Sequence, residues 1–319
     1  MNALKAKPAL AAVFMWVAIG HFSASVTAES APQNTNADTP YPAIHASTKR
    51  SVIEHGRYLV LHVGVCGHCH SETNGVPGPD GEVHLSGRVG APFSVPNLTP
   101  ARTGIGSFSD GAIARALRYN VGSDGRALFL MDFNFSDEDL TAIVSYLRSL
   151  KPEERQVPRT EIKIPRPDRL RAKPSKTSPR GISVERGRYL VESVADCGGC
   201  HTPRDGTTGR ITLPEFSGGV AFNIDKYPDR TYWTANLTRS GRLATFKEND
   251  FVARFRAGRL LEGSPMPWEA WSLMQEDDLR SIYRYLELVP AASVTEHPSV
   301  EIKPSEQTAT SAATNQGTP

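Results

Sequence analysis

Apolar side chains recur at the spacing of an α-helix in six segments of this 319-residue chain. In residues 136–150, the apolar positions Leu140, Ile143 and Leu147 fall on one helical face. Ser136 precedes this stripe and acidic residues follow at once, which is typical of a helix N-terminus. No segment shows sustained alternation of apolar and polar residues, so no β-strand is predicted. The six predicted helices span residues 52–64, 110–119, 136–150, 184–195, 248–258 and 275–288.

The last three predicted helices repeat the first three. The stretch HGRYLVLHVGVCGHCHS, residues 55–71, matches RGRYLVESVADCGGCHT, residues 186–202, at a displacement of 131 positions. The tripeptide Asn-Leu-Thr at 97–99 recurs 139 positions later, and at the same displacement the helix signature DEDL…YL recurs as EDDL…YL. The second copy therefore carries eight more residues between its cysteine motif and this tripeptide. We predict an all-α protein of two tandem helical domains, residues 51–150 (the first repeat) and 182–290 (the second repeat).

Composition distinguishes the segments that flank the repeats. Residues 29–50 are small and polar, and they are predicted to form a flexible lead-in. Residues 151–181 are predicted to form a linker, because six prolines and ten Lys or Arg against four Asp or Glu favour a solvated, extended connector. Residues 291–319, rich in Ser, Thr and Ala, are predicted to form a disordered tail. The net charge of +2 is too small to indicate nucleic acid as a partner.

Residues 1–28 have the pattern of a secretory signal peptide. Lys5 and Lys7 precede an apolar stretch over residues 9–20, and Ala28 ends a small-x-small cleavage pattern. The apolar stretch is shorter than the roughly 20 residues that span a bilayer. We therefore predict export to the periplasm, with a retained anchor that holds the protein on the periplasmic side of the inner membrane as the alternative. The rest of the sequence does not require membrane association.

All four cysteines fall in two copies of Cys-x-x-Cys-His. This pattern is the attachment signature of c-type haem: two thiols on one helical turn bond to the porphyrin, and the histidine binds the iron. In a zinc site, the alternative, the second cysteine pair would follow within about 20 residues. Disulfides or a redox-active dithiol would leave both histidines without a role. The residues predicted to attach two haem c groups are Cys66, Cys69 and His70 in the first repeat and Cys197, Cys200 and His201 in the second.

A six-coordinate haem iron needs a second axial ligand, and a methionine thioether suits an iron that changes oxidation state. Met131 and Met266 occupy the same place in the two repeats, after the middle helix and before the last one. Pro265 and Pro267 restrict the loop that holds Met266. We predict that both methionines are iron ligands, and for Met131 a buried core position is the alternative. Met274 is predicted to lie in the core.

The motifs PNLTP, TGIGSFSD, ARALR and SDEDLTAIVSYLRSL, together with Cys-x-x-Cys-His, resemble class I cytochrome c domains. More narrowly, the chain resembles the multihaem cytochrome c subunits of periplasmic alcohol and gluconate-type dehydrogenases. Those subunits usually carry three haems, whereas this chain has two attachment motifs. The resemblance covers both repeats and implies that their first and last helices cross, with haem between them. The residues it places at the crossings are Gly56, Tyr58, Tyr146 and Leu147 in the first repeat and Gly187, Tyr189, Tyr285 and Leu286 in the second.

The leading hypothesis for function is the transfer of single electrons between redox partner proteins, such as a dehydrogenase or a terminal oxidase. If both axial positions of each iron are filled, no substrate reaches the metal, so the chain is predicted not to be an enzyme itself. The alternative is a dihaem enzyme with an open or unusual iron site, similar to a peroxidase or a thiosulfate dehydrogenase. The first haem, beside the less constrained Met131, is then the candidate for the open site.

Overall fold

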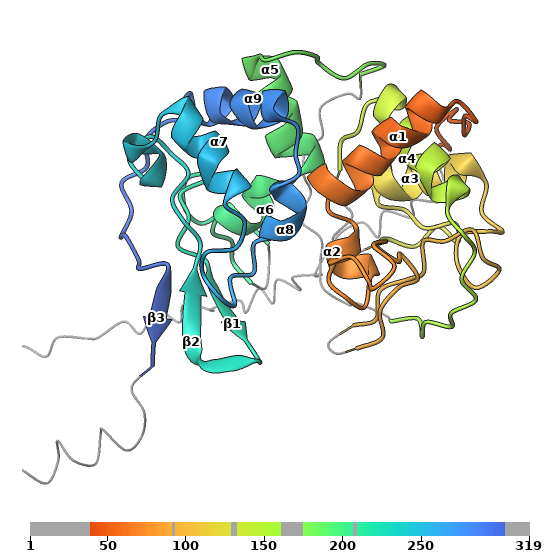
Figure 1. Ribbon diagram of the computed structural model, residues 1–319, viewed down its shortest axis with the longest axis horizontal. Helices are drawn as coiled ribbons and strands as arrows, with labels where there is room; N and C mark the ends of the chain where they lie inside the picture. Colours follow the sequence, from red (N-terminus) through yellow and green to blue (C-terminus); the bar gives the residue numbers. More distant parts are fainter. Residues whose placement is uncertain (1–38, 91–92, 129–132, 161–174, 207–208, 304–319) are drawn as a thin grey trace, which may run out of the picture. The chain divides into compact units, whose positions relative to one another are not determined.

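Each repeat begins with an α-helix that continues into one π-helical turn. In the first repeat, α1 (Arg50–Tyr58) runs into η2 (Leu59–Val63); in the second, α5 (Val184–Tyr189) runs into η3 (Leu190–Val194) (Figure 1). The turn is wide because the amide of Gly64 donates to the carbonyl of Leu59, five residues back, at 2.8 Å. Such turns often occur at functional sites. The computed structural model describes residues 39–90, 93–128, 133–160, 175–206 and 209–303.

The first and last helices of each repeat cross at a glycine. Helix α1 packs against α4 (Asp137–Ser149), and α5 packs against α9 (Glu276–Leu286) (Figure 1). A Cβ atom built at Gly56 lies 1.9 Å from the carbonyl oxygen of Ala142, and one at Gly187 lies equally close to the backbone of α9. Only glycine lets the two backbones approach this closely. The crossing lies where the resemblance to class I cytochrome c places it.

Serine side chains cap the helices that follow the loops. Ser109 Oγ accepts a hydrogen bond from the amide of Ala112 at 3.2 Å, and Ser136 Oγ accepts one from the amide of Asp139 at 3.1 Å. These bonds satisfy amides that a helix leaves without an internal partner, so they fix where α3 and α4 begin. Further helical segments are α2 (Gly67–His70), α3 (Asp110–Tyr119), α6 (Cys197–His201), η4 (Arg242–Thr245), α7 (Glu248–Arg256) and α8 (Trp268–Trp271).

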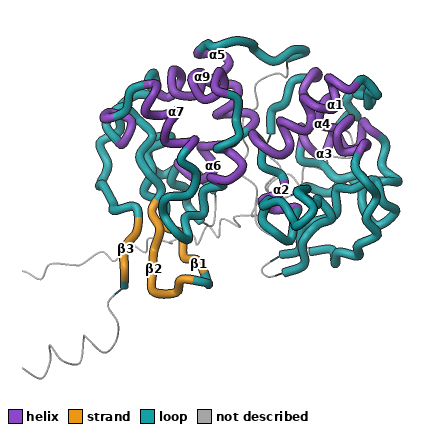
Figure 2. The backbone as a smooth tube through the Cα atoms, in the orientation of Figure 1, coloured by secondary structure: helices purple, strands orange, loops and turns teal. Residues whose placement is uncertain are grey.

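The prediction of an all-α fold is wrong, because the second half of the chain also forms an antiparallel sheet. Its strand order is β1 (Ala221–Ile224), β2 (Tyr227–Trp233), β3 (Val300–Ile302) (Figure 2). Phe222 pairs with Tyr232 across the first two strands. Strands β1 and β2 lie in the stretch where the second repeat is longer than the first, and β3 lies in the predicted disordered tail. The described structure is therefore mixed α and β.

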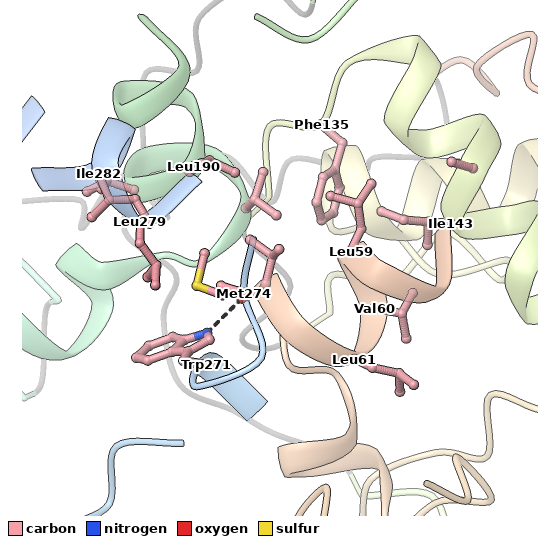
Figure 3. Close-up of a cluster of buried hydrophobic side chains, with 14 of the residues drawn as sticks. Leu59, Val60, Leu61, Phe135, Ile143, Leu190, Trp271, Met274, Leu279 and Ile282 are labelled. Atoms are coloured by element: carbon pink, nitrogen blue, oxygen red, sulfur yellow. Dashed lines mark hydrogen bonds between the residues drawn. The ribbon is translucent and has the colours of Figure 1, made fainter. Parts of the chain in front are cut away.

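One continuous apolar cluster joins the two repeats. Leu59 from the first repeat and Leu190 and Leu279 from the second are all buried in it (Figure 3). Met274 is buried in the same cluster, where the sequence places it. The described residues between 39 and 303 accordingly belong to one compact unit. Among the described helices, none combines the length and the apolar content that crossing a bilayer requires.

Both described ends of the predicted linker pack on the first repeat. The amides of Asp137 and Glu138 donate to the carbonyls of Ser175 and Lys176, each at 3.0 Å. At the other end, the carbonyl of Glu153 accepts from the side-chain amide of Asn97 at 2.8 Å. These parts of the linker are therefore held against the protein. Several predicted features lie outside the described residues, namely the signal peptide 1–28, Met131, linker residues 161–174 and tail residues 304–319.

Candidate functional site

A residue in the left-handed backbone conformation precedes each cysteine motif. The φ angle is +43° at Val65 and +46° at Asp196. This conformation costs a residue other than glycine about 1–2 kcal/mol, and it is especially rare for a β-branched residue such as valine. In the first repeat, the amide of Cys66 donates to the carbonyl of Val60 at 2.9 Å and closes the turn. Both repeats have this conformation at the residue directly before the first cysteine. We infer that it sets the direction in which the cysteine motif leaves the preceding helix.

In the first motif, Cys66 is the N-cap residue of α2 and Cys69 lies within this helix, whereas both cysteines of the second motif lie within α6. In α2, the amide of His70 donates to the carbonyl of Cys66 at 2.8 Å. All four cysteines are free thiols, so the disulfide alternative has no support in the described residues. Burial raises the pKa of Cys66 and of Cys197 to about 12, with Cys69 and Asp196 adding to the effect. Zinc binds thiolates, and the described residues contain no cluster of His, Cys, Asp or Glu suited to a metal ion.

A backbone carbonyl orients the imidazole of each motif. Nδ1 of His70 donates to the carbonyl oxygen of Pro96 at 2.8 Å, and Nδ1 of His201 donates to that of Ala235 at 2.8 Å. Burial lowers the pKa of both imidazoles, that of His70 to about 4, so both are neutral near pH 7. Because Nδ1 carries the proton, the lone pair of Nε2 is available to bind iron.

The repeated Asn-Leu-Thr tripeptide explains the position of these carbonyls. Asn97 Oδ1 accepts from the amide of Thr99 at 2.8 Å, and Asn236 makes the same bond to the amide two residues on. Both asparagines are buried and fold their own loops into turns. Pro96 and Ala235 come directly before them, so each turn holds one carbonyl against a histidine. Sequence reasoning missed these two carbonyls, although the recurring tripeptide was the signal that points to them.

Met266 lies two residues before α8, half-buried against the apolar cluster. Its carbonyl accepts from the amide of Trp268 at 2.8 Å and from Nη2 of Arg259 at 3.2 Å. Arg259 is held in turn by Glu269, whose carboxylate accepts from Nε at 2.6 Å and from Nη2 at 2.7 Å. The backbone at Met266 is therefore fixed on a stiff loop. The iron-ligand role of Met131 stays a prediction, because this residue lies outside the described part of the chain.

The donor groups in each motif fit a covalently attached haem. Two protonated thiols one helical turn apart suit addition to the two vinyl groups of a porphyrin. The neighbouring imidazole is neutral and has Nε2 free for the iron. Cys66 and Cys197 pack against the apolar cluster, which suits the apolar edge of a porphyrin ring.

Comparison with known proteins gives several cytochrome c subunits of dehydrogenases and a diheme cytochrome c among the relatives, although no family model matches the chain. The chain is 29% identical over 273 residues to the fructose dehydrogenase cytochrome subunit of Gluconobacter japonicus, over 77% of its own length. It is 30% identical over 280 residues to the alcohol dehydrogenase (quinone) cytochrome c subunit of Gluconobacter oxydans, over 79% of its length. It is also 27% identical over 265 residues to a diheme cytochrome c-type protein of Cereibacter sphaeroides, over 73% of its length and 84% of that protein.

The chain is similar to cytochrome c subunits of dehydrogenases and to a diheme cytochrome c. The predicted resemblance is thus confirmed, and these relatives imply covalently attached haem c as the cofactor. The chain spans 54% of the length of the fructose dehydrogenase subunit and 58% of the alcohol dehydrogenase subunit.

Proposed function

We propose that this chain is a c-type cytochrome that carries single electrons between a dehydrogenase and a second redox protein in the periplasm. The observation that supports this most directly is the pair of neutral imidazoles, each with its Nδ1 proton committed to a carbonyl and Nε2 free. Haem supplies a reversible one-electron couple when it is bound at such a site. In this proposal the haem-holding residues are Cys66, Cys69 and His70 for the first haem and Cys197, Cys200 and His201 for the second.

The protein's own contribution is a fixed and dry setting. The carbonyls of Pro96 and Ala235 keep each imidazole in one tautomer and one orientation, so the ligand does not rearrange when an electron arrives. Cys66 and Cys197 pack against the apolar cluster, which would limit the access of water to a haem held there. Both features reduce the structural change that accompanies oxidation and reduction.

The sixth iron ligands in this proposal are Met266 and Met131. The carbonyl bonds from Trp268 and Arg259 hold the Met266 loop in place, and the flanking prolines restrict it further. An iron with both axial positions filled has no site for substrate, so the chain would act as a carrier and not as an enzyme.

A dehydrogenase is the proposed electron donor because the relatives named above include cytochrome subunits of a fructose and an alcohol dehydrogenase. The acceptor would be a further redox protein such as a terminal oxidase. The pattern of residues 1–28 supports export to the periplasm, with membrane anchoring on the periplasmic side as the alternative.

The test uses the full chain, matured with haem in an export-competent host. The unmodified protein should gain the mass of two haems and, when reduced, should not bind carbon monoxide, because neither iron has an open position. Met266→Ala should open one iron, so carbon monoxide should then bind at about one site per chain. Met274→Leu is the control, since this buried methionine is a core residue and the substitution keeps its volume.

Two results would contradict the proposal. Carbon monoxide binding by the unmodified reduced protein would indicate an open iron site and favour the dihaem enzyme. A mass without haem would remove the cofactor from the mature chain altogether.

A further inference from the structure

The two repeats exchange a matched pair of hydrogen bonds. The hydroxyl of Tyr58, in the first repeat, donates to Oδ2 of Asp278 in the second at 2.7 Å. The hydroxyl of Tyr189, in the second repeat, donates to Oδ2 of Asp139 in the first at 2.5 Å. The tyrosines occupy equivalent positions, 131 apart, and so do the aspartates, 139 apart. The contact therefore has an approximate two-fold relation that a chance packing contact would not show.

Each tyrosine oxygen also accepts a hydrogen bond from the opposite repeat. The amide of Gln275 donates to the Tyr58 oxygen at 3.0 Å, and the amide of Ser136 donates to the Tyr189 oxygen at 3.1 Å. These amides stand at the N-caps of α9 and α4. Each hydroxyl thus bonds the start of the opposite repeat's last helix twice, once as donor and once as acceptor. Burial, followed by the adjacent carboxylate, raises the pKa of both phenols, so the hydroxyls keep their protons.

A basic side chain from the same repeat holds each aspartate in place. Arg186 donates to both carboxylate oxygens of Asp278, at 2.7 and 2.9 Å, and Nε2 of His55 lies 2.7 Å from Oδ1 of Asp139. The two aspartates are at most 4% exposed. The two carboxylates are therefore held in one orientation by their own repeats. Each can accept the tyrosine hydrogen bond from only one direction.

The tyrosines stand next to the segments that attach haem. Tyr58 ends α1 and Tyr189 ends α5, and each is followed directly by the π-helical turn that leads to its cysteine motif. At one of these turns the contact between repeats continues, because the indole of Trp271 donates to the carbonyl of Val63 at 3.0 Å (Figure 3). The hydrogen bonds between repeats therefore act close to both haem-bearing segments.

We propose that Tyr58 and Tyr189 are positioning residues that hold the two haem-attachment segments in one fixed geometry, so that electrons pass between the haems within one chain. This inference rests on the proposed function and adds to it how the two haems are coupled. Without these directed hydrogen bonds the two repeats could shift against each other across the apolar cluster, and the distance between haems would then vary from one molecule to the next.

The test replaces Tyr58 and Tyr189 with phenylalanine, singly and together, in the haem-loaded chain. Phenylalanine keeps the ring and its packing and removes only the hydroxyl. Tyr283→Phe is the matched control, because that hydroxyl donates to the carbonyl of Phe246 at 2.8 Å inside the second repeat. One readout is the distance between the oxidised haems, measured by pulsed electron paramagnetic resonance. The other is the rate at which an electron placed on one haem by flash reduction equilibrates with the other.

Each tyrosine changed should raise the population with shifted repeats about tenfold, the effect of losing a hydrogen bond to a charged group. The double variant should therefore show longer and more widely spread distances between haems and a slower equilibration. The absorption spectrum and the redox potential of each haem should stay as in the unmodified chain, because neither tyrosine is an iron ligand. The control should match the unmodified chain in every readout.

Unchanged distances and an unchanged equilibration rate in the double variant would overturn the inference. So would the same changes in Tyr283→Phe, which would show a general loss of structure. If the double variant does not fold, the two single variants decide the question by the same comparison with the control. Failure of the proposed function looks different, because the unmodified chain would then lack haem or reversible reduction.

Discussion

The orientation of each haem-site histidine depends on an asparagine that lies outside the cysteine motif. Asn97 and Asn236 fold their tripeptides into turns, and the carbonyl just before each turn accepts the imidazole proton. The asparagine Oδ1 atoms also accept hydrogen bonds from the threonine hydroxyls two residues on, at 2.8 and 2.7 Å. In each repeat, one buried asparagine side chain therefore fixes the conformation of the loop, and the loop carbonyl in turn orients the histidine.

Asn236→Ala is expected to lower the free energy of unfolding by about 2 kcal/mol, because the amide and hydroxyl of Thr238 lose a buried acceptor. Urea unfolding of the haem-loaded protein measures this change. The control is Asn223→Ala in β1, an exposed position where about 0.5 kcal/mol or less is expected. Equal losses at the two positions would contradict the role of the turn.

At the scale of elements, the helix crossings leave no room for a side chain. Gly56→Ala is expected to lower the free energy of unfolding by about 3 kcal/mol, because the new methyl group would lie 1.9 Å from the carbonyl of Ala142. Thermal unfolding measures the change as a lower Tm. Gly90→Ala is the matched control, since a Cβ there meets no atom within 4 Å. A Tm for Gly56→Ala equal to that of the control would show that the helices can move apart without cost.

The helices were predictable because their apolar stripes are local. The segment 110–119 forms α3 with the predicted bounds, and 275–288 contains α9. The strands were not predictable, because β1 and β3 are short and β2 pairs with β3, about 70 residues further on. Pairing partners, more than local propensity, decide whether such short segments become strands. The all-α prediction failed for this reason.

The residues of the candidate site, like the secondary structure, were predictable from the sequence only in part. The cysteines and histidines were visible because their chemistry requires a fixed local spacing. The contacts of Tyr58 with Asp278 and of Tyr189 with Asp139 depend on how the repeats dock, which no local pattern encodes. Their recurrence at equivalent places was nevertheless present in the sequence, and the repeat frame is the signal that points to them.

At the scale of the whole molecule, the two repeats share one apolar core. The cluster includes Leu59 from the first repeat and Leu190 from the second, and the Trp271 indole reaches the carbonyl of Val63. A shared core and specific hydrogen bonds couple the stability of the repeats, because exposing one repeat removes contacts from the other. The linker between the two domains was predicted from proline content and an excess of basic residues, and this composition carries no information on such contacts.

This coupling predicts that the two repeats unfold together. Past the predicted signal peptide, every tryptophan lies in the second repeat, at positions 233, 268 and 271. Tryptophan fluorescence therefore reports on that repeat and, through the Trp271 contact with Val63, on its contact with the first repeat. Gly56→Ala, in the first repeat, should nevertheless shift the fluorescence midpoint in urea to lower concentration. The shift should equal that seen by far-ultraviolet circular dichroism, because coincident transitions are the mark of one cooperative unit. A fluorescence midpoint that stays at the value of the unmodified protein would show that each repeat unfolds on its own.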